Sequence, residues 1–90
     1  MTSVLLQAWE KTLRTRGPQR AVTQASDGRA CTFRELEAGA AAWLEARSAG
    51  EQSALRRRAV VFGETNGIRW LEIFLGLLRP GAVAVPLASA

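Results

Sequence analysis

Ninety residues, of which 48% are hydrophobic and 22% charged, predict a single small globular domain with one modest core. The arginines behind the net charge of +4 are spread along the chain, and their one run, residues 56–58, is short and contains no aromatic residue, which argues against a nucleic-acid-binding arm. The sequence has no histidine, the usual general base and a common metal ligand, and its one cysteine excludes an intrachain disulfide. We expect that cysteine, Cys31, to be a small packed residue, because a nucleophilic thiol needs a neighbouring base.

Neither a signal peptide nor a membrane span is expected from the hydropathy pattern. The N-terminal segment has no basic start, and Gln7 and Glu10 interrupt its apolar residues. The most apolar stretch, residues 70–87, contains Glu72 and Arg79, which argues against a span of about 20 apolar residues. We therefore expect a cytoplasmic protein that contacts neither membranes nor nucleic acids.

The first predicted element is an amphipathic helix over residues 4–16. Its apolar residues recur three or four positions apart and would form the buried face: Val4, Leu5, Ala8, Trp9 and Leu13. Gly17 and Pro18 end this helix, because proline cannot continue the backbone hydrogen bonds.

A short β-hairpin is predicted next, with strands at residues 21–25 and 29–32. Asp27 and Gly28 lie between these strands and tolerate the positive φ of a tight turn. The N-terminal half of the chain therefore contains a helix followed by a hairpin.

A second helix is expected from Phe33 to Gly50. Thr32 and Glu35 have the spacing of a capping box, which satisfies two unpaired backbone donors at a helix start. Gly39 lies among alanines and would let another helix pack closely. The predicted inner face consists of Phe33, Leu36, Ala40, Trp43, Leu44 and the stem of Arg47.

A polar segment without periodicity follows at residues 51–58. Its run of three arginines, residues 56–58, is interpreted as a solvated loop rather than a phosphate-binding patch.

The last part of the sequence predicts a strand, a helix and a second strand. Residues 59–62 and 82–85 are apolar and rich in valine, which is typical of buried strands, and Pro86 closes the second one. The 19 residues between them suffice for the helical, right-handed crossover that parallel strands require. The buried face of this helix is predicted to be Ile68, Leu71, Phe74, Leu75 and Leu78.

The turn at residues 63–67 precedes this third helix and has two interpretations. Free backbone donors at a helix start can hold a phosphate, but the turn has no dinucleotide fingerprint and no lysine follows it. We therefore expect Asn66 to be a helix cap.

The fold class that follows is α/β, with three helices, a short N-terminal β-hairpin and a C-terminal right-handed βαβ unit. A two-stranded parallel sheet with one helix cannot cover both of its faces. We therefore expect residues 1–90 to be a single N-terminal subdomain, an incomplete part of a larger doubly wound domain.

Three patches resemble the start of the superfamily that contains acyl-CoA synthetases, luciferases and nonribosomal-peptide adenylation domains. Residues 31–36, Cys-Thr-Phe-Arg-Glu-Leu, are similar to the first core motif, with Phe33 in place of the commoner tyrosine. Residues 78–87, Leu-Arg-Pro-Gly-Ala-Val-Ala-Val-Pro-Leu, are similar to the second, although Pro80 and Ala84 depart from it. Residues 59–78 resemble the strand, turn and apolar helix between these motifs.

The resemblance implies a longer AMP-forming ligase that condenses a carboxylic acid with ATP to an acyl-adenylate. The acyl group then passes to a thiol, such as that of CoA or a carrier-protein phosphopantetheine. ATP and Mg are implied for that parent enzyme, whose phosphate loop and catalytic lysine would lie beyond Ala90. We therefore expect no catalytic, cofactor-binding or metal-binding residue here, and an inactive scaffold segment whose partner is the remainder of the parent enzyme.

Other readings of the sequence remain open beside this one. A stand-alone, non-enzymatic interaction module could use the same scaffold, and exposed apolar surface could cause self-association. A small arginine-rich nucleic-acid binder would instead show steep salt dependence. Trp9, Trp43 and Trp70 lie on helical faces and are interpreted as packing residues.

Overall fold

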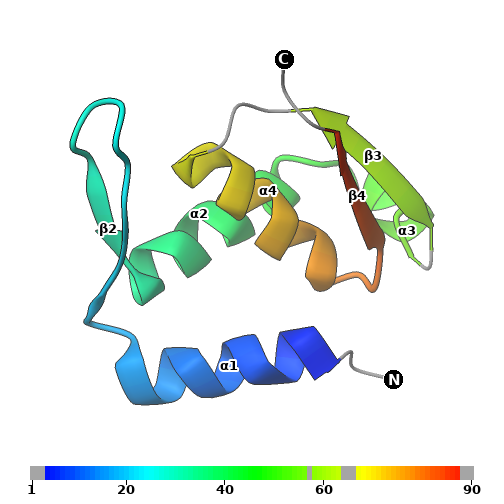
Figure 1. Cartoon of the computed structure of the whole chain (residues 1–90). Helices are drawn as coiled ribbons and strands as arrows, with labels where there is room; N and C mark the ends of the chain where they lie inside the picture. The colour runs from blue at the N-terminus through cyan, green and yellow to red at the C-terminus, as the bar shows by residue number, and fades with distance from the viewer. Residues whose placement is uncertain (1–3, 57, 64–66, 88–90) are drawn as a thin grey trace.

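The computed structural model describes residues 4–56, 58–63 and 67–87, and this part of the chain is a mixed α/β fold with four helices and two two-stranded sheets (Figure 1). The two central helices, α2 and α4, share the most extensive contacts, with the hairpin at one end and the parallel sheet at the other. The elements are α1 (Val4–Arg16), β1 (Arg20–Thr23), β2 (Ala30–Thr32), α2 (Phe33–Glu45), α3 (Ala49–Ala54), β3 (Ala59–Gly63), α4 (Ile68–Leu78) and β4 (Val83–Leu87).

The predicted hairpin is confirmed, with β1 antiparallel to β2. Gly28 in its turn has a φ of 73°, a left-handed conformation that glycine adopts without strain. Asp27 stabilises the turn because its carboxylate accepts hydrogen bonds from the Arg29 backbone N–H and from the Gln24 side-chain amide. The register shifts between Arg20 and Val22, so the pairing is irregular where the hairpin leaves α1.

The capping box at the start of α2 is also confirmed. The Glu35 N–H donates to Thr32 Oγ1 at 3.1 Å, and the Thr32 N–H donates to Glu35 Oε1 at 2.8 Å. The prediction that this helix continues to Gly50 is wrong, because α2 ends at Glu45 and Gly50 lies inside a separate helix, α3.

Helix α3 was not predicted, although its signal is present in the sequence. Ser48 and Glu51 form a second capping box, with the Glu51 N–H donating to Ser48 Oγ and the Ser48 N–H donating to Glu51 Oε1. This cap restarts a helix within the segment that was predicted to be irregular. The chain therefore has four helices in its described part rather than three.

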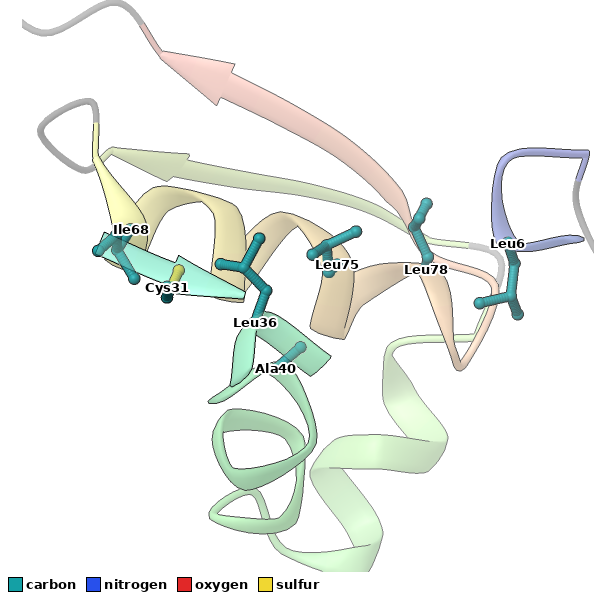
Figure 2. Packing of buried hydrophobic residues seen from close by; sticks show 7 residues of the cluster. All are labelled: Leu6, Cys31, Leu36, Ala40, Ile68, Leu75 and Leu78. Carbon is teal, nitrogen blue, oxygen red and sulfur yellow. The ribbon is translucent and has the colours of Figure 1, made fainter. Parts of the chain in front are cut away.

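The core lies where α2, α4 and the hairpin meet. Figure 2 shows its buried side chains, with α1 contributing Leu6 and β2 contributing Cys31: Leu6, Cys31, Leu36, Ala40, Ile68, Leu75 and Leu78. The predicted inner face of α1 is partly wrong, because Val4 and Leu5 are 80% and 59% exposed while Leu6 is buried. Only one side of the start of α1 reaches the core, and helical periodicity alone left the choice between neighbouring apolar residues open.

Helices α2 and α4 approach each other closely through small residues, as the position of Gly39 predicted. A Cβ atom on Gly76 would lie 2.7 Å from Trp43 and 3.0 Å from the Ala40 carbonyl oxygen, so only glycine fits there. On α4, Leu77 is fully buried beside the predicted stripe. Helix α4 lies between α2 and the sheet, and so it buries two sides rather than one (Figure 1).

Strands β3 and β4 pair in parallel, as predicted, with Ala59 opposite Val83 and Gly63 opposite Leu87. The expected cap of α4, Asn66, lies outside the described residues. The N-cap position of α4 is occupied by Gly67, whose backbone is extended and which offers no side-chain cap.

Candidate functional site

One face of the parallel sheet is bare of protein within the described part of the chain. Alternate residues of paired strands share a face, so the register places six residues on it: Ala59, Val61, Gly63, Val83, Val85 and Leu87. Val61, Val83 and Leu87 are 59%, 58% and 55% exposed, and Val85 is 36% exposed. We call this surface, which contains no charged or polar side chain, the bare sheet face.

The opposite face of the sheet is covered by α4. Val60, Phe62 and Ala84 are partly buried there, and the ring of Phe62 lies 5.6 Å from that of Trp70. The prediction that residues 59–62 and 82–85 form buried strands is therefore wrong for the bare sheet face, on which Val61, Val83 and Val85 are exposed. A single crossover helix covers one side of a sheet, and no second described element reaches the other.

Covering the exposed side chains of the bare sheet face would stabilise the protein. Complete burial of a Val or Leu side chain contributes about 1.5–3 kcal/mol, so covering these four half-exposed side chains would contribute roughly 4 kcal/mol. That is a large share of the net stability of a small domain, which is about 5–15 kcal/mol. This surface is therefore the strongest candidate for an interaction site.

A shallow groove of about 310 Å³ lies between α1, the end of α4 and the start of β4. Val83 belongs to both this groove and the bare sheet face, and the groove is lined by Leu5, Phe74, Leu78, Gly81, Ala82, Val83 and Ala84. The exposed Leu5 thus lies next to the sheet, and apolar surface extends across two elements.

A second cavity, of about 580 Å³, lies between the hairpin and the start of α4. Its walls come from residues 22–26 of the hairpin and from Gly67, Trp70 and Leu71. Gln24 connects the two elements, because its Oε1 accepts a hydrogen bond of 2.9 Å from the Ile68 N–H. Sequence reasoning missed this contact, since nothing in the sequence links positions 44 residues apart.

The residues of the two sequence motifs have structural roles within the fold. Thr32 and Glu35 cap α2, and Gly81 adopts a φ of 80° in the turn before β4. Arg79, in the same turn, forms an ion pair with Glu37 of α2. These contacts hold β4 and α2 in place whether or not a ligand is near.

Cys31 is 7% exposed and lies among the apolar residues of the core, as expected for a packed residue. Burial raises the pKa of its thiol, and the negative charge of Glu35 raises the pKa further. A thiol with a raised pKa is a poor nucleophile at neutral pH.

The three tryptophans make packing contacts. The ring of Trp9 lies 6.1 Å from that of Phe33, and its Nε1–H donates to Glu37 at 3.3 Å. Trp70 stacks on Phe74 with ring centroids 5.3 Å apart. Trp43 packs against Gly76, and the guanidinium of Arg47 lies 5.3 Å from its ring centroid.

The arginine run that was interpreted as a solvated loop lies between α3 and β3. Arg56 and Arg58 are exposed, and Arg57 lies outside the described residues. Arg56 and Arg79 line a depression of about 500 Å³ between α2, α3 and the turn after α4.

No helix in residues 4–56, 58–63 and 67–87 is long and apolar enough to cross a membrane. In the same ranges, no three His, Cys, Asp or Glu side chains are grouped so that they could hold a metal ion.

Comparison with known proteins identified no relative of this chain. No protein-family model, no curated protein and no solved structure matches this chain.

Proposed function

We propose that this chain is the N-terminal part of an ATP-dependent acyl-activating enzyme and that it supplies scaffold rather than catalytic groups. The parent reaction joins a carboxylic acid to ATP, forming an acyl-adenylate and releasing pyrophosphate. The acyl group then passes to a thiol of CoA or of a carrier protein. In this proposal ATP and Mg bind to the remainder of the enzyme.

The bare sheet face carries the proposal. Parallel sheets occur almost only with both faces covered by helices, because strand–helix–strand crossovers place helices on the faces. Here α4 covers one face, while Val61, Val83, Val85 and Leu87 remain exposed on the other. A larger doubly wound domain, in which further helices pack on this face, accounts for the exposed valines and leucine.

The resemblance of two patches to the core motifs of the acyl-activating superfamily supports the same proposal. Residues 31–36 span the end of β2 and the capped start of α2, and residues 78–87 span the end of α4, its turn and β4. Both patches fix the positions of α2 and β4 relative to the core.

The coding sequence downstream of the Ala90 codon tests the proposal directly. Continuation into a glycine-, serine- and threonine-rich loop that ends in lysine would support it, whereas a stop codon would contradict it. The purified chain, mixed with ATP, Mg and a panel of carboxylic acids, should release no pyrophosphate. Turnover by the chain alone would contradict the scaffold role.

A non-enzymatic interaction module is the second candidate, and the unpaired edges of the parallel sheet favour it. Each sheet in the described residues has only two strands, so the outer edges of β3 and β4 have no strand partner there. Such edges and the bare sheet face would be covered by another protein or by a second copy of the chain. A stop codon after Ala90 would select this candidate.

A further inference from the structure

Along its outer edge, the backbone of β3 presents a row of hydrogen-bonding groups that no strand in the described part of the chain pairs with. The Val83 N–H donates to the Arg58 carbonyl oxygen at 2.8 Å. Successive residues of a strand direct their backbone groups to opposite sides, so this bond determines which residues of each strand face the other strand. Arg58, Val60 and Phe62 therefore direct their backbone groups toward β4. The N–H and C=O groups of Ala59, Val61 and Gly63 point outward, where the two-stranded sheet has no further strand.

The outer edge of β4 is a poorer template for another strand. By the same alternation, Ala84 and Pro86 direct their backbone groups outward from β4. Proline has no N–H, so this edge lacks one of the donors that a further strand would need. The two edges of the sheet are therefore unequal, and only β3 keeps every outward donor.

Strand β3 also lacks the devices that normally protect an edge. Residues 59–63, Ala-Val-Val-Phe-Gly, contain no charge and no proline, and the strand is regularly paired with β4 over its full length. The β3 residues on the bare sheet face, Ala59, Val61 and Gly63, are small and apolar, and the exposed Val61 lies at the centre of the strand.

We propose that β3 pairs with β3 of a second copy of the chain, antiparallel, about a twofold axis at Val61. In this register Val61 lies opposite Val61 of the second copy, and Ala59 lies opposite Gly63. All outward groups of the strand then pair, which gives about six hydrogen bonds between the copies. The result is one four-stranded sheet, in the order β4, β3, β3 and β4. The bare sheet faces of the two copies lie side by side on the same side of this sheet.

The antiparallel arrangement also limits charge repulsion between two chains of net charge +4. It places the two Arg58 residues at opposite ends of the paired strands, about six residues or roughly 20 Å apart. This separation exceeds the Debye length of about 8 Å at physiological ionic strength, so their repulsion is largely screened.

This inference concerns the chain as it stands and does not rest on the acyl-activating assignment. Analytical ultracentrifugation of the 90-residue chain over a wide concentration range should show reversible formation of a dimer. Amide hydrogen exchange should slow with concentration at Ala59, Val61 and Gly63, and it should stay unchanged at Ala84 on the other edge. A chain that is monomeric at every concentration would overturn the proposal.

Two matched variants separate edge pairing from stacking of the bare sheet faces. Val61 and Val83 lie on the same face and are equally exposed, at 59% and 58%. Val61→Lys places two lysines opposite each other across the twofold axis and should weaken dimerisation about tenfold or more, whereas Val83→Lys should leave it unchanged. Equal loss in both variants would indicate face stacking and would overturn edge pairing.

A third variant tests the hydrogen bonds themselves. Val61→Pro removes an outward N–H without removing a bond to β4, and it should yield a monomer. Circular dichroism of each variant checks that it is folded. If a variant unfolds, amide hydrogen exchange of the unmodified chain still tests the proposal. Concentration-dependent protection of the Ala84 amide, without protection of the Val61 amide, would contradict it.

Discussion

Gln24 Oε1 accepts a hydrogen bond of 2.9 Å from the backbone N–H of Ile68, the first residue of α4. The N-cap residue of that helix, Gly67, has no side chain to satisfy this donor. The cap therefore comes from the hairpin, 44 residues earlier, and it ties the turn of the hairpin to the buried helix. Ile68 is itself 2% exposed, so its N–H cannot rely on water.

Replacing Gln24 with alanine should lower the free energy of unfolding by about 1–2 kcal/mol, because it leaves a helix-start donor at a buried residue without a partner. Urea denaturation monitored by tryptophan fluorescence measures the change. Gln7→Ala is the matched control, since Gln7 is exposed on α1 and its loss should change stability by less than about 0.5 kcal/mol. Equal effects of the two substitutions would contradict the long-range cap.

The two capping boxes should differ in their effect on global stability. Thr32→Ala should cost about 1 kcal/mol, because α2 carries Leu36 and Ala40 of the core. Ser48→Ala removes the same kind of cap from α3, a six-residue helix with no buried residue, and should mainly increase local fraying. Urea denaturation reports the first effect and amide exchange at residues 51–54 reports the second. A larger global loss for Ser48→Ala would show that α3 is part of the cooperative core.

Replacing Gly76 or Gly50 with alanine should change the stability of the protein in opposite directions. Gly76→Ala should destabilise the chain by about 1–2 kcal/mol, because the new Cβ would lie 2.7 Å from Trp43 and 3.0 Å from the Ala40 carbonyl oxygen. Gly50→Ala meets nothing closer than Ser48 Oγ at 4.0 Å, and helix propensity favours alanine by up to about 1 kcal/mol. Thermal denaturation should therefore show a lower Tm for the first variant and an equal or higher Tm for the second. A higher Tm for Gly76→Ala would mean that α2 and α4 can move apart without cost.

The features that could be predicted from the sequence are those encoded by neighbouring residues. Thr32 and Glu35 specify a helix start three residues apart, and Asp27 and Gly28 specify a turn. Ser48 and Glu51 carry the same capping signal, but the apolar pattern of α2 continues up to it and favours one uninterrupted helix to Gly50.

The remaining features depend on neighbours that are distant in the sequence. Nothing local distinguishes Leu6, which is buried, from Leu5, which is exposed, because both are leucines at the start of one helix. The apolar run of β3 predicts burial on both faces, yet burial also requires an element to cover each face, and α4 covers only one. The bare sheet face therefore emerges only when register and packing are known.

The carboxyl group of Asp27 should titrate at a lower pH than an ordinary aspartate. Its hydrogen bond from the Arg29 N–H, followed by that from the Gln24 amide, holds the pKa of this carboxyl below its ordinary value of 3.8. A lowered folded-state pKa means that the contribution to stability is complete above the unfolded-state pKa and is lost as the pH falls through the folded-state pKa. NMR titration of Asp27 measures the shift, and Asp27→Asn should reduce the acid dependence of unfolding. A midpoint at or above 3.8 would contradict the turn geometry.

The thiol of Cys31 should be protected from modification by the same packing that stabilises the core. Its side chain is 7% exposed, and burial raises its pKa, so little thiolate forms near neutral pH and reagent has poor access. Labelling with a disulfide reagent at pH 8 should be much slower for the native chain than for the chain in urea. If labelling proceeds through unfolding, the destabilised Gly76→Ala variant should react faster by about the factor that its loss of stability implies, roughly tenfold for 1.4 kcal/mol. Equal rates for the native and unfolded chains would show that the hairpin opens without disturbing the core, and Cys31 would then lie outside the cooperative unit.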